Sequence, residues 1–106
     1  MMWKLFLDDE RIPEKKHGDH QWTIARSSDE AIRLVEERGC PIFISFDHDL
    51  GGDDTSMVFL KWLTDKVLDG EIFMPDDFSY QVHSANIVGS KNICAFLNSF
   101  LRVRNG

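Results

Sequence analysis

The sequence predicts an α/β fold, a small doubly wound and mainly parallel sheet of about four strands with helices on both faces. Short apolar runs alternate along the chain with segments of helical periodicity. This alternation is typical of right-handed βαβ crossovers in a parallel sheet. The chain has 106 residues, of which 42% are hydrophobic, enough apolar surface for one core. We therefore expect a single domain over residues 1–106.

Four apolar runs predict the strands. Residues 3–7 form the first run, which ends abruptly in acidic residues as a buried strand does at a sheet edge. Residues 22–26 alternate in character and predict the second strand. Residues 41–46 are nearly continuous in β-branched and aromatic side chains, so we expect a central strand buried on both faces. Residues 78–82 predict the fourth strand.

The first predicted helix follows the second strand. Ser27 and Glu30 have the spacing of a capping box, which is typical of a helix start. Gly39 followed by Pro41 is a signal for the end of that helix. The link between the first two strands, about residues 12–21, resembles a loop rather than a helix.

Two further helices are predicted. Asp54 or Thr55 can cap the second helix, and Gly70 ends it. Gly89 and Ser90 are expected to begin the third helix. The apolar side chains of that helix keep i, i+3, i+4, i+7 and i+8 spacing, which predicts one buried face: Ile93, Phe96, Leu97, Phe100 and Leu101.

Charge and composition exclude several classes of function. Lys plus Arg number 12 against 18 Asp plus Glu, and the net charge of −6 has the wrong sign for capture of duplex nucleic acid. No stretch approaches the roughly 18 to 20 apolar residues of a membrane span, and the opening run is too short for a signal peptide. The two cysteines have no metal-type spacing. We expect a soluble, cytoplasmic protein that does not bind membranes.

Polar side chains gather where three of the four predicted strands end. Asp8 and Asp9 follow the first strand, the segment 47–49 follows the third, and the segment 83–86 follows the fourth. The carboxyl ends of the strands of a doubly wound sheet open on one crevice, where ligands bind. Crowded carboxylates need a counter-charge, and Mg²⁺ accepts carboxylates, waters and substrate phosphate. Nearby imidazoles leave Mn²⁺ as an alternative. The predicted metal ligands are Asp8, Asp9, Asp47 and Asp49.

Each of these clusters also has a plainer interpretation. An Asp-Asp pair after an apolar run is most often a turn or a helix start. The hydroxyl of Ser84 and the amide of Asn86 could satisfy only the backbone of a loop. The Asp-His-Asp sequence of residues 47–49 is a stronger signal, because a turn does not need two carboxylates beside an imidazole. The convergence of three clusters at one sheet edge favours the functional interpretation.

Three sequence blocks carry a family resemblance. LFLDDERIP at 5–13, FDHDLGGDDT at 46–55, and VHSAN with VGSKN within 82–92 resemble the signature blocks of the cyclic-phosphate processing receiver domains. The resemblance implies a receiver-like, flavodoxin-like fold and action on cyclic phosphates. It also implies that Asp8, Asp9 and Asp47 take the metal positions of response-regulator receivers, and that Ser84 or His83 replaces the receiver hydroxyl after strand four.

The sequence departs from the receiver pattern in two respects. The fifth strand with its receiver lysine has no counterpart, which argues against an ordinary phosphorelay switch. Ser56 and Ile87 stand where glycine and proline are more usual in the family. These two changes affect the expected geometry of the loops and spare the polar groups.

These observations lead to a functional hypothesis, a metal-dependent phosphoesterase that acts on a cyclic or terminal phosphate of a nucleotide or RNA. The catalytic candidates are Asp47, His48 and His83, because imidazole titrates closest to neutral pH. The candidates for phosphate binding are Arg11, Ser84, Asn86 and Ser90, the last with backbone amides at a helix start. The alternatives are a non-catalytic module that binds a cyclic nucleotide or phosphorylated partner, and phosphoacceptor signalling through Asp47. The sequence leaves the oligomeric state open.

Overall fold

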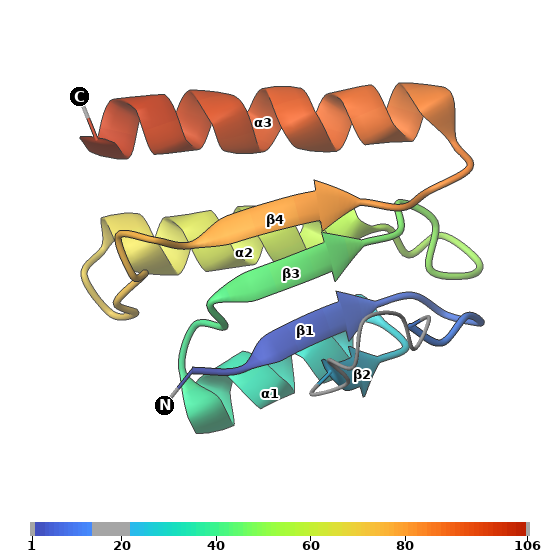
Figure 1. The fold of residues 1–106 in the computed structure, drawn as a ribbon, viewed down its shortest axis with the longest axis horizontal. Helices are drawn as coiled ribbons and strands as arrows, with labels where there is room; N and C mark the ends of the chain where they lie inside the picture. Colours follow the sequence, from blue (N-terminus) through green and yellow to red (C-terminus); the bar gives the residue numbers. More distant parts are fainter. Residues whose placement is uncertain (1, 14–21, 106) are drawn as a thin grey trace.

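A computed structural model describes residues 2–13 and 22–105. Its strands form one four-stranded sheet in the order β2-β1-β3-β4, and all neighbouring strands are parallel (Figure 1). The strands are β1 (Lys4–Leu7), β2 (Trp22–Ala25), β3 (Phe43–Phe46) and β4 (Ser79–Val82). The predicted receiver-like fold class, with a parallel sheet and the expected strands in sequence order, is confirmed.

The central strands β1 and β3 form the point at which the strand order reverses. The chain runs from β1 outward to β2, and then returns past β1 to β3 and β4. Ligand crevices in open α/β sheets form at such a reversal, beyond the carboxyl ends of the strands. The amide of Asp47 donates to the carbonyl of Leu7 at 2.8 Å, so the pairing of β1 with β3 continues one residue past the strands. This contact holds the two segments that follow these strands side by side.

The helices of the described residues are α1 (Ser28–Arg38), α2 (Ser56–Leu68) and α3 (Ile87–Asn105). Ser27 caps α1 as predicted, because its hydroxyl accepts the amide of Glu30 at 3.1 Å. Of the two candidate caps for α2, the structure uses Thr55, whose hydroxyl accepts the amide of Met57 at 3.3 Å. None of the described helices is long and apolar enough to cross a membrane.

The third helix begins two residues earlier than predicted, at Ile87 rather than at Gly89 and Ser90. The reason is the side chain of Asn86, whose Oδ1 accepts the amide of Gly89 at 2.8 Å. The carbonyl of Asn86 accepts the amide of Ser90 at 2.8 Å. Asn86 therefore caps the helix, and the amides of Gly89 and Ser90 are both hydrogen-bonded.

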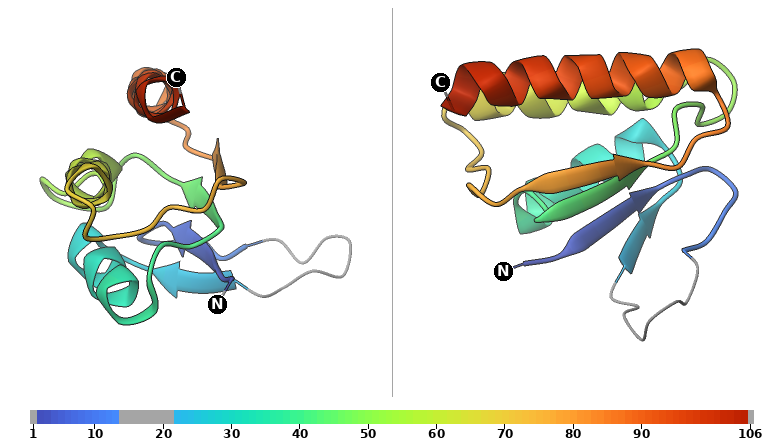
Figure 2. Two further views of the ribbon diagram at one scale, coloured as in Figure 1. Left: turned by 90° about the vertical axis from the view of Figure 1, so that its left-hand side faces the viewer. Right: turned by 45° about the horizontal axis from the view of Figure 1, so that its top comes forward.

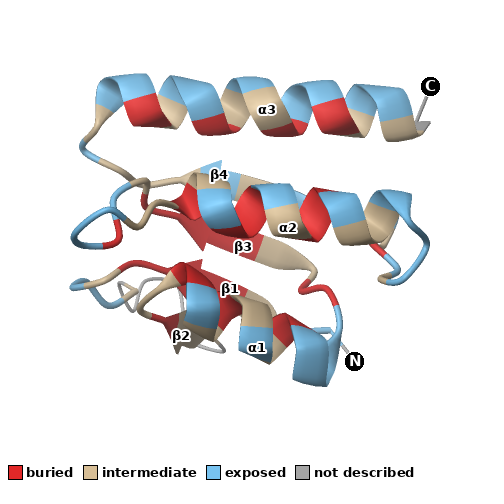
Figure 3. Ribbon diagram, turned by 180° about the vertical axis from the view of Figure 1, so that it is seen from behind, coloured by how far each residue is buried: buried red, intermediate tan, exposed pale blue. Residues whose placement is uncertain are grey.

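The described helices all lie on one side of the sheet, so the expectation of helices on both faces is wrong for this part of the chain (Figures 2 and 3). The crossovers from β2 to β3 and from β3 to β4 run in the same direction across the sheet. Right-handed crossovers in one direction place their helices on one face. Only the link from β1 to β2 runs the other way, and its described residues, 8–13, contain no helix.

The main core lies between the sheet and this helical layer. Leu5, Leu7, Ile44 and Phe46 point from the central strands into the core and are fully buried. Their helical partners in the core are also fully buried: Ala31, Phe59, Leu60, Leu63, Ile93 and Leu97. The opposite face of the sheet carries side chains of intermediate burial such as Trp22, Ile24 and Phe43. The sheet is therefore asymmetric, with one fully buried face and one partly exposed face.

Candidate functional site

The segments that follow β1, β3 and β4 meet at one edge of the sheet and enclose a crevice of about 430 Å³. The crevice lies at the carboxyl ends of the strands, where the topology predicts a ligand site. Its lining residues are Asp9, Glu10, Arg11, Asp47, Asp49, Gly51, Gly52, Ser84, Ala85 and Asn86. The structure therefore brings together all three polar clusters that the sequence placed at strand ends.

Three carboxylates form a compact group at this edge, which we call the carboxylate triad: Asp8, Asp9 and Asp47. One oxygen from each residue lies within 4.8 Å of the others. Asp8 and Asp47 are buried, so water screens their mutual repulsion poorly. Carboxylate oxygens at this spacing are the donors that Mg²⁺ and Mn²⁺ accept. The triad is therefore a group that could hold a divalent cation.

Asp8 is the most constrained member of the triad. Its Oδ1 accepts the backbone amides of Glu10 and Arg11 at 2.8 and 2.9 Å. Its Oδ2 faces Nε2 of His83 at 2.9 Å. Burial alone would raise the pKa of Asp8, but the two amides and the adjacent imidazole outweigh burial, so the pKa is lowered. Asp8 is therefore an ionised carboxylate near neutral pH, and Oδ2 retains a lone pair for a cation.

His83 links the triad to the sheet. Nε2 of His83 faces Asp8, and Nδ1 lies 2.7 Å from the hydroxyl of Ser45 on β3. The ring stacks on Phe6, with centroids 4.5 Å apart and an interplanar angle of 8°. Gln81 extends the chain of hydrogen bonds, because its amide Nε2 donates to the Ser45 hydroxyl at 2.9 Å. The imidazole is therefore held on both nitrogens and on one ring face.

His48 occupies a different position, and neither histidine is among the residues that line the crevice. Its Nδ1 lies 3.1 Å from Oδ1 of Asp49. The ring rests against Gly89 so closely that a Cβ built on this glycine would lie 2.3 Å from Cγ of His48. Gly89 therefore provides the space for the imidazole.

Asp49, which was expected as a fourth metal ligand, lies outside the carboxylate triad. Its Oδ2 instead accepts the side-chain amide of Asn86 at 3.0 Å, and its Oδ1 faces His48. These hydrogen bonds lower the pKa of the exposed Asp49 carboxyl, the bond from Asn86 more than the bond from His48. Asp49 thus joins the loop after β3 to the start of α3.

The loop between β3 and α2 owes its shape to two glycines and two hydrogen-bonding side chains. Gly51 and Gly52 have φ of 92° and 56°, values that strongly favour glycine. Asp54 accepts the amide and the hydroxyl of Ser28 at 2.8 and 2.6 Å, which ties the loop to α1. The hydroxyl of Ser56 donates to the carbonyl of Asp47. The unusual Ser56 thus contributes directly to the position of the loop.

The four residues expected to bind phosphate do not all lie at the crevice. Arg11, Ser84 and Asn86 line the crevice, whereas Ser90 does not. Arg11 is half exposed, and its Nη1 donates to the carbonyl of His83 at 2.9 Å. The hydroxyl of Ser84 accepts the amide of Asn86, whose own side chain caps α3. The argument for Ser90 from free helix-start amides is wrong, because its amide already donates to Asn86.

Sequence reasoning missed three residues that organise the site. Ser45 and Gln81 hold His83, as described above. Arg26 braces the segment after β1, because its Nη1 donates to the carbonyls of Asp8 and Arg11. A buried hydroxyl within the otherwise apolar run 43–46 was the available signal for Ser45. No sequence signal distinguished Gln81 and Arg26 from ordinary surface residues of strands.

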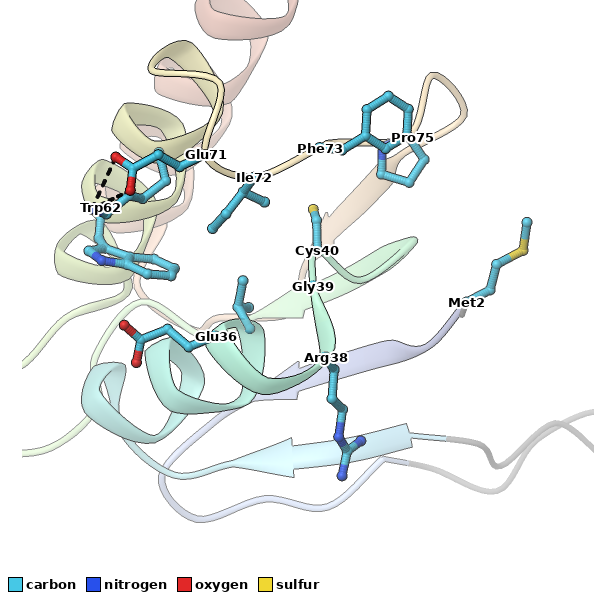
Figure 4. Close-up of a pocket in the computed structure, with 12 residues that line it drawn as sticks. Met2, Glu36, Arg38, Gly39, Cys40, Trp62, Glu71, Ile72, Phe73 and Pro75 are labelled. Carbon is cyan, nitrogen blue, oxygen red and sulfur yellow. Dashed lines mark hydrogen bonds and ion pairs between the residues drawn. The ribbon is translucent and has the colours of Figure 1, made fainter.

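A larger pocket, of about 690 Å³, lies at the opposite edge of the sheet (Figure 4). Gly39, Cys40, Ile72 and Phe73 line it, and they precede β3 and β4 rather than follow them. Among the described residues, the carboxylate triad is the one cluster suited to a metal ion, and it is absent from this pocket. This pocket is therefore distant from the carboxylate triad and the polar side chains around it.

Fold and site together define a class, a receiver-like α/β domain with an acidic pocket at the carboxyl edge of its sheet. A family model for the cyclic-phosphate processing receiver domain matches residues 3–99. The chain belongs to this family, which ties it to cyclic-phosphate processing. Comparison with curated proteins gave no significant match, and comparison with solved structures gave none either.

Proposed function

We propose that this protein is a metal-dependent phosphoesterase that acts on a cyclic or terminal phosphate of a nucleotide or RNA. One observation carries the proposal: Asp9 and Asp47 of the carboxylate triad line the crevice at the carboxyl ends of the strands, and the buried third member, Asp8, has an imidazole 2.9 Å away. Hydrolysis of a phosphate ester can use a divalent cation to polarise the phosphoryl oxygens and a histidine to transfer protons. Membership of a cyclic-phosphate processing family supports the same class of ligand.

The donor set suits Mg²⁺ or Mn²⁺. Asp8 offers Oδ2, while Asp9 and Asp47 offer one carboxylate oxygen each. Such a cation, when bound, neutralises the triad and polarises the phosphoryl oxygens. Arg11, whose Nε lies 3.7 Å from Oδ2 of Asp8, lines the same crevice as Ser84, and we assign binding of the phosphate oxygens to these two residues.

His83 is the residue to which we assign proton transfer. Its side chain is 19% exposed and lines the neighbouring pocket, while its Nε2 lies 2.9 Å from Asp8 of the triad. Ser45, fully buried beneath it, is a positioning residue that holds Nδ1. We assign to His48 the support of the loop after β3, because its ring is enclosed by Gly89 and Asp49.

The test is hydrolysis of 2′,3′-cyclic and 3′,5′-cyclic nucleotides by the purified protein with Mg²⁺ or Mn²⁺. We expect turnover that EDTA abolishes, and His83→Ala should lower kcat/KM by about 10² to 10⁴. Lys61→Ala, at an exposed position of α2 outside the three signature blocks, serves as the control and should be unaffected.

Two outcomes would contradict this assignment. Wild-type turnover in His83→Ala would remove His83 from the mechanism. Thermal stabilisation by a cyclic nucleotide with no product formed would favour a non-catalytic binding module instead.

A further inference from the structure

A second pocket, of about 360 Å³, lies directly beside the crevice on the face of the sheet that no described helix covers. Its volume falls in the range of about 300 to 1,000 Å³ that is typical of small-molecule sites. Its lining combines apolar and polar side chains: Phe6, Arg11, Ile12, Pro13, Trp22, Ser45, Gln81 and His83. We call this the sheet-face pocket.

The sheet-face pocket is continuous with the proposed phosphate site through two residues. Arg11 lines both the crevice and the sheet-face pocket. His83 lines the sheet-face pocket and lies 2.9 Å from Asp8 of the carboxylate triad. The backbone and side chain of Arg11 are held against Asp8 and His83, so its position between the two cavities is defined. One ligand can therefore place a phosphate in the crevice and an adjoining group in this pocket.

The walls of the pocket favour a flat, aromatic group. Phe6 and Trp22 meet edge to face with centroids 5.8 Å apart, and Pro13 adds a further apolar surface. Ile12 is 66% exposed at the same pocket, so a ligand there would cover an apolar side chain that now faces water.

One polar group at the pocket is suited to the edge of a base. Gln81 is exposed and donates through Nε2 to Ser45, which leaves its Oε1 without a hydrogen-bond partner among the described residues. Glutamine side chains read the donor and acceptor edges of bases. Because Ser45 holds the nitrogen end of this amide, Oε1 is presented as an acceptor for a ring or exocyclic N–H.

We propose that the sheet-face pocket binds the nucleobase of the phosphate ester whose phosphate lies in the crevice. The inference rests on the proposed function and deepens it, because it assigns the place where the base of that nucleotide or RNA binds. Trp22 stacks on the base, Gln81 accepts a hydrogen bond from it, and Arg11 lies between base and phosphate.

The experiment measures binding of 3′-AMP, ribose 5-phosphate and inorganic phosphate, by calorimetry and by NMR titration with Mg²⁺ present. Wild-type protein should bind 3′-AMP at least about tenfold more tightly than ribose 5-phosphate. Trp22→Ala should weaken the binding of 3′-AMP about tenfold, as expected for loss of one stacking partner. The affinity for inorganic phosphate should not change. Trp62→Ala, which removes a tryptophan at the distant pocket, is the matched control and should change neither affinity.

A second pair of variants keeps the inference testable if Trp22→Ala fails to fold. Gln81→Ala should reduce the preference for 3′-AMP, whereas Ser79→Ala, two residues earlier on the same face of β4, should not. Equal binding of 3′-AMP and ribose 5-phosphate would overturn the base site while leaving the phosphate site intact. Failure to bind any of the three phosphates would overturn both. A change in oligomeric state caused by Trp22→Ala would assign the face to self-association instead.

Discussion

The contact between His48 and Gly89 joins two segments that are far apart in the sequence. Gly89 is buried in the first turn of α3, and the imidazole occupies the space that any larger side chain would need. The glycine lowers the intrinsic stability of its helix by roughly 1 kcal/mol relative to alanine. Its small size nevertheless lets the loop after β3 approach α3.

Gly89→Ala tests this contact. In an ordinary helix this change stabilises by about 1 kcal/mol, but here the new methyl group meets Cγ of His48, which cannot move without rotation of the whole ring. We expect a net loss of about 1 kcal/mol in the free energy of unfolding, and NMR shifts at His48 and Asp49. Asn92→Ala, at an exposed position of α3, is the control and should be neutral or slightly stabilising. A more stable Gly89→Ala protein with an unchanged His48 would refute the contact.

Cys40 provides a second prediction at the residue scale. Burial raises the pKa of this thiol from 9.0 to about 12, so its thiolate fraction near pH 8 is about a thousandfold lower than that of an unperturbed cysteine. We expect iodoacetamide to leave Cys40 unmodified in the native protein and to alkylate it fully in urea, as measured by peptide mass spectrometry. Rapid native alkylation of Cys40 would show that the amino-terminal edge of β3 opens readily.

At the scale of elements, the loop between β3 and α2 sets the position of Asp47. It is fastened at three places: Asp54 binds Ser28 at the start of α1, Ser56 binds the carbonyl of Asp47, and Asp49 binds Asn86. These contacts reach α1, α2 and α3 in turn. The carboxylate triad therefore depends on the packing of the whole helical layer.

Asp54→Ala should weaken this attachment. The change leaves the first-turn amide and the hydroxyl of Ser28 without their acceptor, which costs about 1 to 2 kcal/mol. Asp53→Ala, at the exposed neighbouring position, is the matched control and should lie within about 0.5 kcal/mol of wild type. Urea denaturation measures both variants, and equal midpoints for the two would contradict the proposed role of Asp54.

The elements also show what the sequence could and could not predict. Asp8, Asp9 and Asp47 were predicted to meet because they lie within two residues of a strand end, and strand ends are recognisable from apolar runs. Asp49 could not be separated from Asp47, because the turn of the loop points its carboxylate toward Asn86. The one-sided helical layer was missed because it follows from the order of the strands across the sheet, which no local pattern reveals.

At the scale of the whole molecule, the net charge of −6 and the carboxylate triad both make the electrostatic potential at the crevice negative. An acidic protein repels phosphate at long range, so a phosphorylated ligand needs local positive charge at the crevice. Arg11 supplies one such charge, and a cation on the triad would reverse the local field. Metal binding and ligand binding are therefore expected to be coupled.

Metal binding itself can be tested without any assay of activity. We expect Mg²⁺ or Mn²⁺ to raise the Tm, because a cation that binds only the folded state at 100 times its Kd adds about 2.7 kcal/mol of stability. Asp47→Asn should abolish this shift, since it removes one charge of the triad. Asp49→Asn also removes one negative charge, but from a residue outside the triad. The metal-induced rise in Tm should therefore persist in this variant. Differential scanning calorimetry of the three proteins at fixed pH and ionic strength, with and without EDTA, measures this contrast. Loss of the shift in both variants would mean that net charge rather than the triad governs metal binding.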